Sequence, residues 1–247
     1  LPDLTQDVVA VDASGEVTIT QSTPAGTLLD LGETIITLTI ADGNGNSTTR
    51  ETIVSVLDLT APIVTSYRSS YIQNIPQRGV GIVPDVVSTV VASENCGGVT
   101  VTQDLQAGIE VPPGIYNINI AVSDTAGNTT NLISTLIVNA IPVAEDQQVN
   151  VKEDQTTAIA LLGNDLEGPG INYIITSLPT NGLLYGYLDS ISNCVEITTN
   201  MLGTILFTNV VFYTPNTNYF GTDAFTFAAS DAFATSAVAT INFAIEA

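Results

Sequence analysis

Val17–Gln21 (VTITQ) recurs 82 residues further along the chain as Val99–Gln103 (VTVTQ). The match continues without a gap: a D-x-x-G-N stretch at Asp42 returns at Asp124, and residues 17–56 have 13 identities with their counterparts. A fixed period in strand-like sequence indicates tandem copies of one small folded unit. The repeat therefore predicts several small domains rather than one large domain.

Apolar and polar residues alternate in three places, and each run begins after a glycine. The expected inward residues are Ile36, Leu38 and Ile40 after Gly32; Tyr116, Ile118, Ile120 and Val122 after Gly114; and Phe225 and Phe227 after Gly221. A period of two predicts half-buried strands. Each run ends in an aspartate ten residues beyond its glycine, at Asp42, Asp124 and Asp231, and an apolar strand follows. The same hairpin is thus predicted three times.

Proline-containing stretches divide the chain. Asp58-Leu-Thr-Ala-Pro62 closes the first copy, and Ala140-Ile-Pro142 closes the second. These boundaries predict domains at 1–60, 61–140 and 141–247, each of a size that suits an antiparallel β-sandwich. The predicted fold is all-β, with three tandem immunoglobulin-like β-sandwich domains in an elongated array.

The first predicted domain is shorter than the second by one or two strands, which exposes a sheet edge. Two explanations stay open. Either the chain begins inside a domain of a longer polypeptide, or a neighbouring chain donates the missing strand and so builds a head-to-tail polymer.

The net charge of −21 arises from 25 carboxylates against four cations. Nucleic-acid binding needs clustered Lys and Arg, so this function is excluded. A solvated acidic surface and oxygen-binding cations such as calcium both fit the composition. The chain has no His, which excludes Ser-His and Cys-His nucleophiles and the usual zinc sites. No carboxylate pair stands out for glycosidase chemistry, so we expect no enzymatic activity.

Cys96 and Cys194 lie in different predicted domains and neither belongs to a CxxC pair. An interdomain or intermolecular disulfide is one interpretation, and two isolated, buried small residues is the other. No apolar run approaches the length of a membrane span, so this segment is not expected to insert into a bilayer.

The repeated signature resembles the hyalin repeat (HYR), an immunoglobulin-like domain. The resemblance rests on V-T-x-T-Q, A-G, G and D-x-x-G-N-x-T, followed by V-x-D-x-T-A-P at Val56–Pro62, and on Glu94–Gly98 in the place of an Asp-Asn-Cys motif. Asp42–Asn46 is similar to versions in giant surface adhesins of Bacteroidetes-type bacteria. The family's disulfide partner for Cys96 is missing, because Thr65–Arg68 has no cysteine.

Residues 141–247 instead resemble a bacterial cadherin-like or Ig-like tandem repeat. The motifs are Pro142–Asp146, Leu161–Asp165, Leu178–Gly182, Tyr213–Asn216 and Phe220–Phe225. In such repeats acidic loops near domain junctions hold calcium, which needs six to eight oxygen ligands. The resemblance implies calcium ligands at Glu153, Asp154, Asn164, Asp165, Glu167 and Asp231, with Glu145 and Asp146 at the junction.

Two further patterns have a structural explanation beside the functional one. Asp42-x-Asn44-x-Asn46 starts like an EF-hand loop but lacks the later ligands, so we interpret Asp and Asn as caps of a hairpin turn in which Gly45 and Gly127 take positive φ. Aromatic residues of the last domain offer a sugar-stacking surface or, more simply, core and cross-strand pairs. They are Tyr185, Tyr187, Tyr213, Tyr219 and Phe220.

Together these patterns predict an extracellular or cell-surface structural segment that acts as a spacer, an adhesin part or a filament or matrix subunit. Its expected partners are neighbouring domains or copies of the same protein. The alternatives are a glycan- or matrix-binding module and the non-catalytic appendage of a secreted hydrolase.

Overall fold

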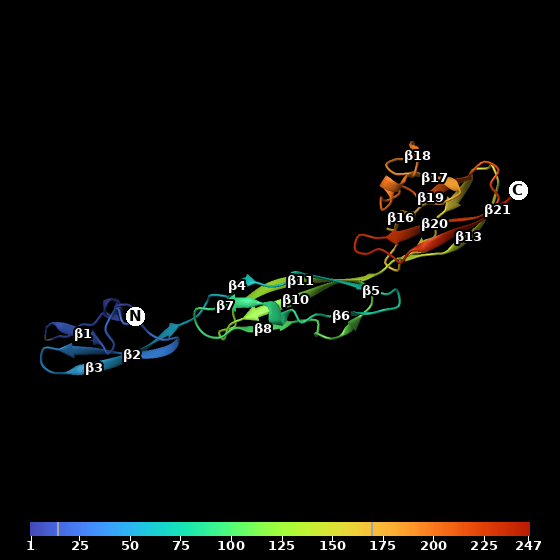
Figure 1. Ribbon diagram of the computed structural model, residues 1–247. Helices are drawn as coiled ribbons and strands as arrows, with labels where there is room; N and C mark the ends of the chain where they lie inside the picture. The colour runs from blue at the N-terminus through green and yellow to red at the C-terminus, as the bar shows by residue number, and fades with distance from the viewer. Residues whose placement is uncertain (14, 169) are drawn as a thin grey trace. The chain divides into compact units, whose positions relative to one another are not determined.

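The computed structural model describes residues 1–13, 15–168 and 170–247. These residues form β-strands and three short 3-10 helices, η1 (Leu4–Asp7), η2 (Val87–Thr89) and η3 (Thr199–Met201) (Figure 1). No α-helix occurs among them, which confirms the predicted all-β class. Nor is any helix in the described ranges long and apolar enough to cross a membrane.

The described residues divide into two compact units. Unit 1 comprises Leu1–Thr65, Val91–Val101 and Ala121–Asn131, and unit 2 comprises Ser66–Val90, Thr102–Ile120 and Leu132–Ala247. The division cuts through the middle one of the three predicted domains. The predicted boundaries at 60 and 140 therefore stay predictions.

Unit 1 begins with a three-stranded antiparallel sheet, called the first sheet, of β1 (Val17–Gln21), β2 (Gly32–Asp42) and β3 (Ser47–Val56). Ile36 and Leu38 of β2 are buried, as the alternation predicted, because their side chains share one face of the strand. Asp42 caps the β2–β3 turn by accepting the N–H groups of Asn44 and Asn46, and Gly45 has a φ of 90°. The interpretation of this stretch as a turn is confirmed.

The next part of the chain runs through both units. Its strands are β4 (Ile63–Ser66), β5 (Ser70–Ile75), β6 (Gly81–Ile82), β7 (Val91–Ser93), β8 (Thr100–Gln103), β9 (Glu110–Val111), β10 (Gly114–Ser123) and β11 (Thr129–Ala140). The larger sheet has the order β5-β11-β10-β8, and β4·β7 and β6·β9 form short pairs. Ile118, Ile120 and Val122 are buried as predicted. β5 runs parallel to β11, with Ser70 opposite Thr135 and Ile75 opposite Ala140.

The remaining strands all belong to unit 2. They are β12 (Val143–Ala144), β13 (Gln147–Lys152), β14 (Thr157–Ala160), β15 (Gly163–Asn164), β16 (Asn172–Ser177), β17 (Gly182–Tyr187), β18 (Cys194–Glu196), β19 (Val210–Pro215), β20 (Gly221–Ser230) and β21 (Ala239–Glu246). They form two four-stranded sheets, β13-β21-β20-β16 and β14-β19-β17-β18, and the pair β12·β15 (Figure 1).

Both of these sheets contribute to one core, so residues 141–247 form a β-sandwich. Phe225 and Phe227 are fully buried, as predicted, and Phe243 stacks on Tyr213 with ring centroids 4.0 Å apart. The hydroxyl of Tyr213 donates to Asp223. A buried tyrosine needs such an acceptor, since its O–H has no water to bond with.

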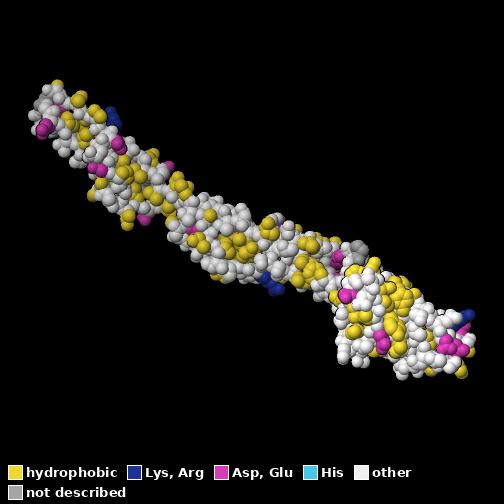
Figure 2. Space-filling view, turned by 90° about the horizontal axis from the view of Figure 1, so that it is seen from above, with side chains coloured by type: hydrophobic (Ala, Val, Ile, Leu, Met, Phe, Trp, Pro, Cys, Tyr) yellow, Lys and Arg dark blue, Asp and Glu magenta, His cyan; other side chains and the backbone are white. Residues whose placement is uncertain are grey.

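Neither cysteine is a buried small residue, so that interpretation is wrong. Cys96 is half-buried and Cys194 is exposed on β18, and both are free thiols. β18 is the edge strand of its sheet, which leaves the side chain of Cys194 in solvent. Basic side chains appear at only a few places on the face in Figure 2, in line with the four cations of the sequence.

Candidate metal centre

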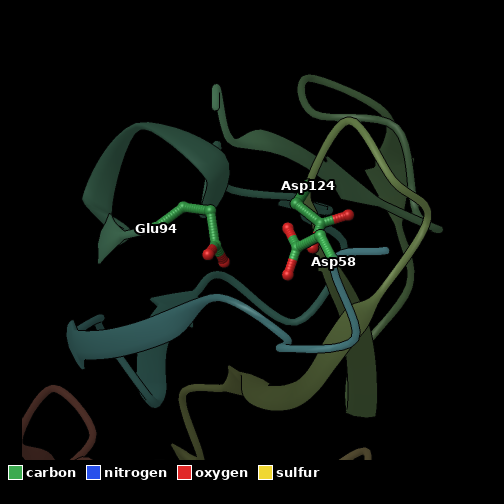
Figure 3. Close-up of side chains that lie close together, drawn as sticks. All are labelled: Asp58, Glu94 and Asp124. Carbon is green, nitrogen blue, oxygen red and sulfur yellow. The ribbon is translucent and has the colours of Figure 1, made fainter. Parts of the chain in front are cut away.

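Three loops of unit 1 bring carboxylates together. Asp58 follows the end of β3, Glu94 comes directly after β7, and Asp124 comes directly after β10. One carboxylate oxygen from each residue lies within 4.8 Å of the other two (Figure 3). We call Asp58, Glu94 and Asp124 the acidic trio.

Asp124 is held in place by the turn that it caps. Its Oδ1 accepts the N–H of Asn128 at 2.9 Å and its Oδ2 accepts the Asn128 side-chain amide at 2.8 Å. Gly127 takes a φ of 94°, which lets the chain reverse within this loop. Burial alone raises the pKa of Asp124, but hydrogen bonds from Asn128, Gly127 and Ala126 more than offset it and leave the pKa lowered. The carboxylate is therefore charged at neutral pH.

The other two carboxylates are each fixed through one oxygen. Oδ1 of Asp58 accepts the N–H of Thr60 at 3.0 Å, and Oε1 of Glu94 accepts the N–H of Asn95 at 2.6 Å. The carbonyl of Asp58 also accepts the side-chain amide of Asn128 at 3.1 Å. The segment after β3 is thereby tied to the same asparagine that orients Asp124.

The second oxygen of each of these two carboxylates lacks a partner. Oδ2 of Asp58 and Oε2 of Glu94 are buried and accept no hydrogen bond from any described residue. A buried polar group left unpaired costs about 1–3 kcal/mol, and more when it is charged. Such an arrangement of two unsatisfied acceptors beside a third carboxylate favours a cation as the missing partner.

No local sequence pattern marks the acidic trio, because each member has a local explanation. Asp58 was interpreted as part of a boundary, Glu94 as part of a family motif and Asp124 as a turn cap. One signal was available: the 82-residue offset also pairs Asp12 with Glu94. Asp12 and Asp42 line one hollow of the first sheet, so the pairing of these two positions recurs in both copies.

Three of the six predicted calcium ligands do come together in unit 2. Asp165 lies against Glu167 and Asp231, and we call these three the second acidic cluster. The N–H of Ala140 donates to Oε1 of Glu167, and the Asn139 side chain donates to Oδ2 of Asp231 at 3.0 Å. Two of its three carboxylates are thus satisfied by the segment that ends β11.

Glu153 and Asp154 lie apart from this cluster. The side-chain amide of Gln77 donates to the backbone carbonyl of Asn164. The N–H of Glu153 donates to the backbone carbonyl of Glu246, and Oδ1 of Asp154 accepts the N–H of Asn218. Glu246 is beside the start of β20, whereas Asp231 follows its end. Ten strand residues span roughly 30 Å, so the six residues do not form one site. At the junction, Glu145 bonds to Leu162 and Asp146 accepts the N–H of Thr240.

Replacing Asp165 by Asn is expected to stabilise the chain at neutral pH in the presence of a chelator. Burial raises the pKa of Asp165, and the neighbouring carboxylates of Glu167 and Asp231 raise it further. A raised folded-state pKa means that stability is lost as pH rises through it. We expect a melting temperature about 2 °C higher than that of the wild-type chain at pH 7.

Melting curves recorded from pH 4 to pH 7 check this expectation. The gain from Asp165→Asn should shrink toward pH 4, because the raised pKa of the wild-type carboxyl lets it take up a proton as the pH falls. If calcium binds at the second acidic cluster, calcium should reverse the order, because the variant loses a ligand. A variant that is less stable in chelator at pH 7 contradicts the electrostatic account.

Comparisons with known proteins give the fold class. Residues 139–244 match the family model of the Bacterial Ig domain. No curated protein sequence matches the chain. With the strand order above, the family match shows tandem immunoglobulin-like β-sandwich domains, as predicted. The hyalin-repeat and adhesin assignments stay resemblances.

Several solved structures are similar to most of the chain, at low TM-scores. The I-band fragment I67–I69 from titin has 12% identity and a TM-score of 0.40, over 95% of this chain and 89% of that one. Protocadherin Gamma B2 extracellular cadherin domains 1–5 have 17% identity and a TM-score of 0.35, over 94% of this chain. An endo-fucoidan hydrolase from glycoside hydrolase family 107 has 16% identity and a TM-score of 0.28, over 96%. The chain spans 53% of the protocadherin and 38% of the hydrolase.

Proposed function

We propose that this chain is a load-bearing structural segment of a larger extracellular, cell-surface protein, and that it has no catalytic role. Tandem Ig-like domains suit structural and adhesive modules outside the cell, and the composition without His supports the absence of nucleophilic catalysis. In the family resemblance, the parent is a giant Bacteroidetes-type adhesin. The observation that carries the mechanical role is the parallel pairing of an early strand with the last strand, which occurs in two of the three predicted domains.

In residues 141–247 the first long strand is parallel to the last. Gln147 of β13 lies opposite Ile241 of β21, and Lys152 lies opposite Glu246. A tandem chain under tension pulls β13 from its beginning and β21 from its end. Because the two strands point the same way, this pull slides one past the other and loads all the ladder hydrogen bonds together. Hydrogen bonds loaded together resist more force than bonds that open one at a time.

The preceding domain repeats the arrangement. β5 pairs in parallel with the end of β11 over six residue pairs, from Ser70·Thr135 to Ile75·Ala140. The first sheet has no such pair within the described part of the chain, since its order is β1-β2-β3 with every neighbour antiparallel. The proposal therefore assigns high mechanical resistance to two domains and low resistance to the first sheet.

Stretching single molecules held by their two ends should give two high-force unfolding events. The released chain should be about 25 nm long for residues 70–140 and about 35 nm for residues 147–246. Gln148→Pro and Val149→Pro form a matched pair, since adjacent residues of the edge strand β13 point their N–H groups alternately toward β21 and away from it.

The proline that removes an N–H facing β21 should lower the force of the 35 nm event, and the adjacent proline should change it much less. The 25 nm event serves as an internal control in both variants. Low-force, gradual extension of the wild-type chain is incompatible with a load-bearing role.

We also propose that a further strand adds to the free edge of β3, supplied by a second copy of this chain. β3 and the residues after it correspond, at the 82-residue offset, to the part of β11 that binds β5. Ile53 and Leu57 there are 59% and 70% exposed. Light scattering in calcium-containing buffer tests this step: a polymer supports strand addition, and a monomer at all concentrations rejects it.

A glycan- or matrix-binding module is the second candidate. An open hollow on the sheet β14-β19-β17-β18 is lined by Tyr185, Tyr187 and Phe212, with Thr156 and Thr214 at its side. Tyr187 and Phe212 meet edge to face at 6.0 Å. Of the aromatics named from sequence, Tyr213 is instead in the core and Phe220 is exposed. A glycan array on the wild-type chain and Tyr187→Ala separates this candidate from a purely mechanical role.

A further inference from the structure

We propose that the acidic trio binds one calcium ion, and that this ion links the segment after β3 to the loops after β7 and β10. The inference goes beyond the proposed mechanical function and concerns residues outside the calcium set predicted from sequence. Two observations carry it: the convergence of the carboxylates and the unpaired buried oxygens.

The donor atoms match calcium in kind and in spacing. All three are carboxylate oxygens within 4.8 Å of one another. Calcium–oxygen distances are roughly 2.3–2.6 Å, so two oxygens on one ion lie at most about 5 Å apart. Calcium completes its sphere with backbone carbonyls and water, which suits a site that opens toward the hollow beside Glu94 lined by Thr60 and Ser93. Nitrogen or thiolate ligands, which zinc and copper prefer, are not part of the trio.

Oδ2 of Asp58 and Oε2 of Glu94 are the atoms that need the ion. Both are buried without a partner, although the other oxygen of each carboxylate accepts a backbone N–H. Asp124, only 8% exposed, adds a third carboxylate within 4.8 Å of them. None of these residues forms an ion pair with a Lys or Arg in the described chain. A divalent cation removes most of this charge and satisfies both oxygens at once.

The second acidic cluster is satisfied in part by the chain itself, although Oδ1 of Asp165 is also buried there without a partner. There the side-chain amide of Asn139, near the end of β11, donates to Asp231, and the N–H of Ala140 donates to Glu167. For Oδ2 of Asp58 and Oε2 of Glu94, no described residue of unit 1 supplies such a donor. A cation is a partner that fits both of these oxygens.

Calcium titration of the full chain, after removal of metal with a chelator, tests the site directly. In wild-type protein the amide resonances of Thr60, Asn95 and Asn128 should shift together, because each N–H donates to one carboxylate of the trio. The amide of Asn46, which donates to Asp42 in the equivalent turn of the first sheet, provides the comparison. A titration that moves none of the three trio amides overturns the proposal.

Asp58→Asn and Glu94→Gln keep the size of each side chain and remove one charge. In chelator both variants should melt at or above the wild-type temperature, because they relieve repulsion among the three carboxylates. In millimolar calcium the wild-type chain should gain several degrees and the two variants should gain little. Glu51→Gln, an exposed substitution on β3, should behave as wild type in both buffers.

An ion at the site is recognised when the order of melting temperatures reverses: the variants melt at or above the wild type in chelator, and below it in calcium. A structural role of Asp58 without an ion predicts the same loss in both buffers, and equal calcium shifts in wild type, Asp58→Asn and Glu94→Gln overturn the inference. If a variant does not fold, the wild-type resonance titration still decides. A null result in the force measurement leaves this test untouched, so the two proposals fail independently.

Discussion

Asp223→Ala is expected to unfold the last domain under conditions in which the rest of the chain stays folded. Asp223 is 8% exposed, and its two oxygens accept four hydrogen bonds. Oδ1 accepts the N–H groups of Thr180 and Ala224, and Oδ2 accepts the N–H of Asn181 and the hydroxyl of Tyr213. Hydrogen bonds to a charged group contribute about 1.5–3 kcal/mol each, and losing all four leaves buried donors unpaired. We expect the free energy of unfolding to fall by about 3–5 kcal/mol.

The loss should be graded by how much of the network each substitution removes. Tyr213→Phe deletes one donor and should cost about 1.5–3 kcal/mol. Burial, the hydrogen bond to Asp223 and its charge raise the pKa of Tyr213, so the hydroxyl is a donor at neutral pH. Asp223→Asn should also be destabilised, because its side-chain NH2 group takes the place of an oxygen that accepts two hydrogen bonds in the wild-type chain. Asp189→Ala, on an exposed loop, is the control.

Hydrogen-exchange mass spectrometry checks this prediction and assigns it to a domain. Exchange in Asp223→Ala should rise throughout residues 147–246 and stay unchanged in β5 and β10. A variant with protected strands β20 and β21 contradicts the assigned role of Asp223.

Ile118→Ala should lower the free energy of unfolding of the predicted domain at 61–140 by about 2–5 kcal/mol. Ile118 is 0% exposed in the middle of β10, and truncation leaves a cavity that the neighbouring strands cannot fill without moving. Ile115 on the same strand is 72% exposed, so Ile115→Ala should change the free energy of unfolding by less than about 0.5 kcal/mol.

The repeat supplies a second comparison for this prediction. Ile36 occupies the position of Ile118 in the first sheet and is also 0% exposed. Calorimetry should show a lower melting temperature for one transition in Ile118→Ala and for a different transition in Ile36→Ala. In Ile115→Ala no transition should shift from its wild-type temperature. If Ile118→Ala melts with the wild type, β10 does not carry the core of its domain.

Local pattern predicted the strands well because burial on one face forces a period of two. Ile36, Ile118 and Phe225 show this alternation in all three runs. The hairpin turn could be predicted equally well, because Asp42 and Gly45 need only their nearest neighbours to form it. These features depend on interactions between residues close in sequence or one strand apart.

The metal-binding candidates depend on contacts that local pattern does not contain. Asp58, Glu94 and Asp124 meet only because β3, β7 and β10 end near one point. Conversely, the family resemblance grouped Asp154 with Asp231, although the length of β20 separates them. The exposure of Cys194 has the same origin, because edge position is a property of the sheet and not of the strand.

The parallel pairing of β13 with β21 has a consequence for how this sequence can diversify. The two attachment points of the domain are joined directly through one six-residue ladder, so the sheet β14-β19-β17-β18 lies outside the path of tension. Substitutions and insertions on that sheet, including the stretch between β17 and β18, can then change its surface without weakening the tether. In the proposed load-bearing role, one sheet of the sandwich carries the tension, and the surface of the other sheet is free to vary.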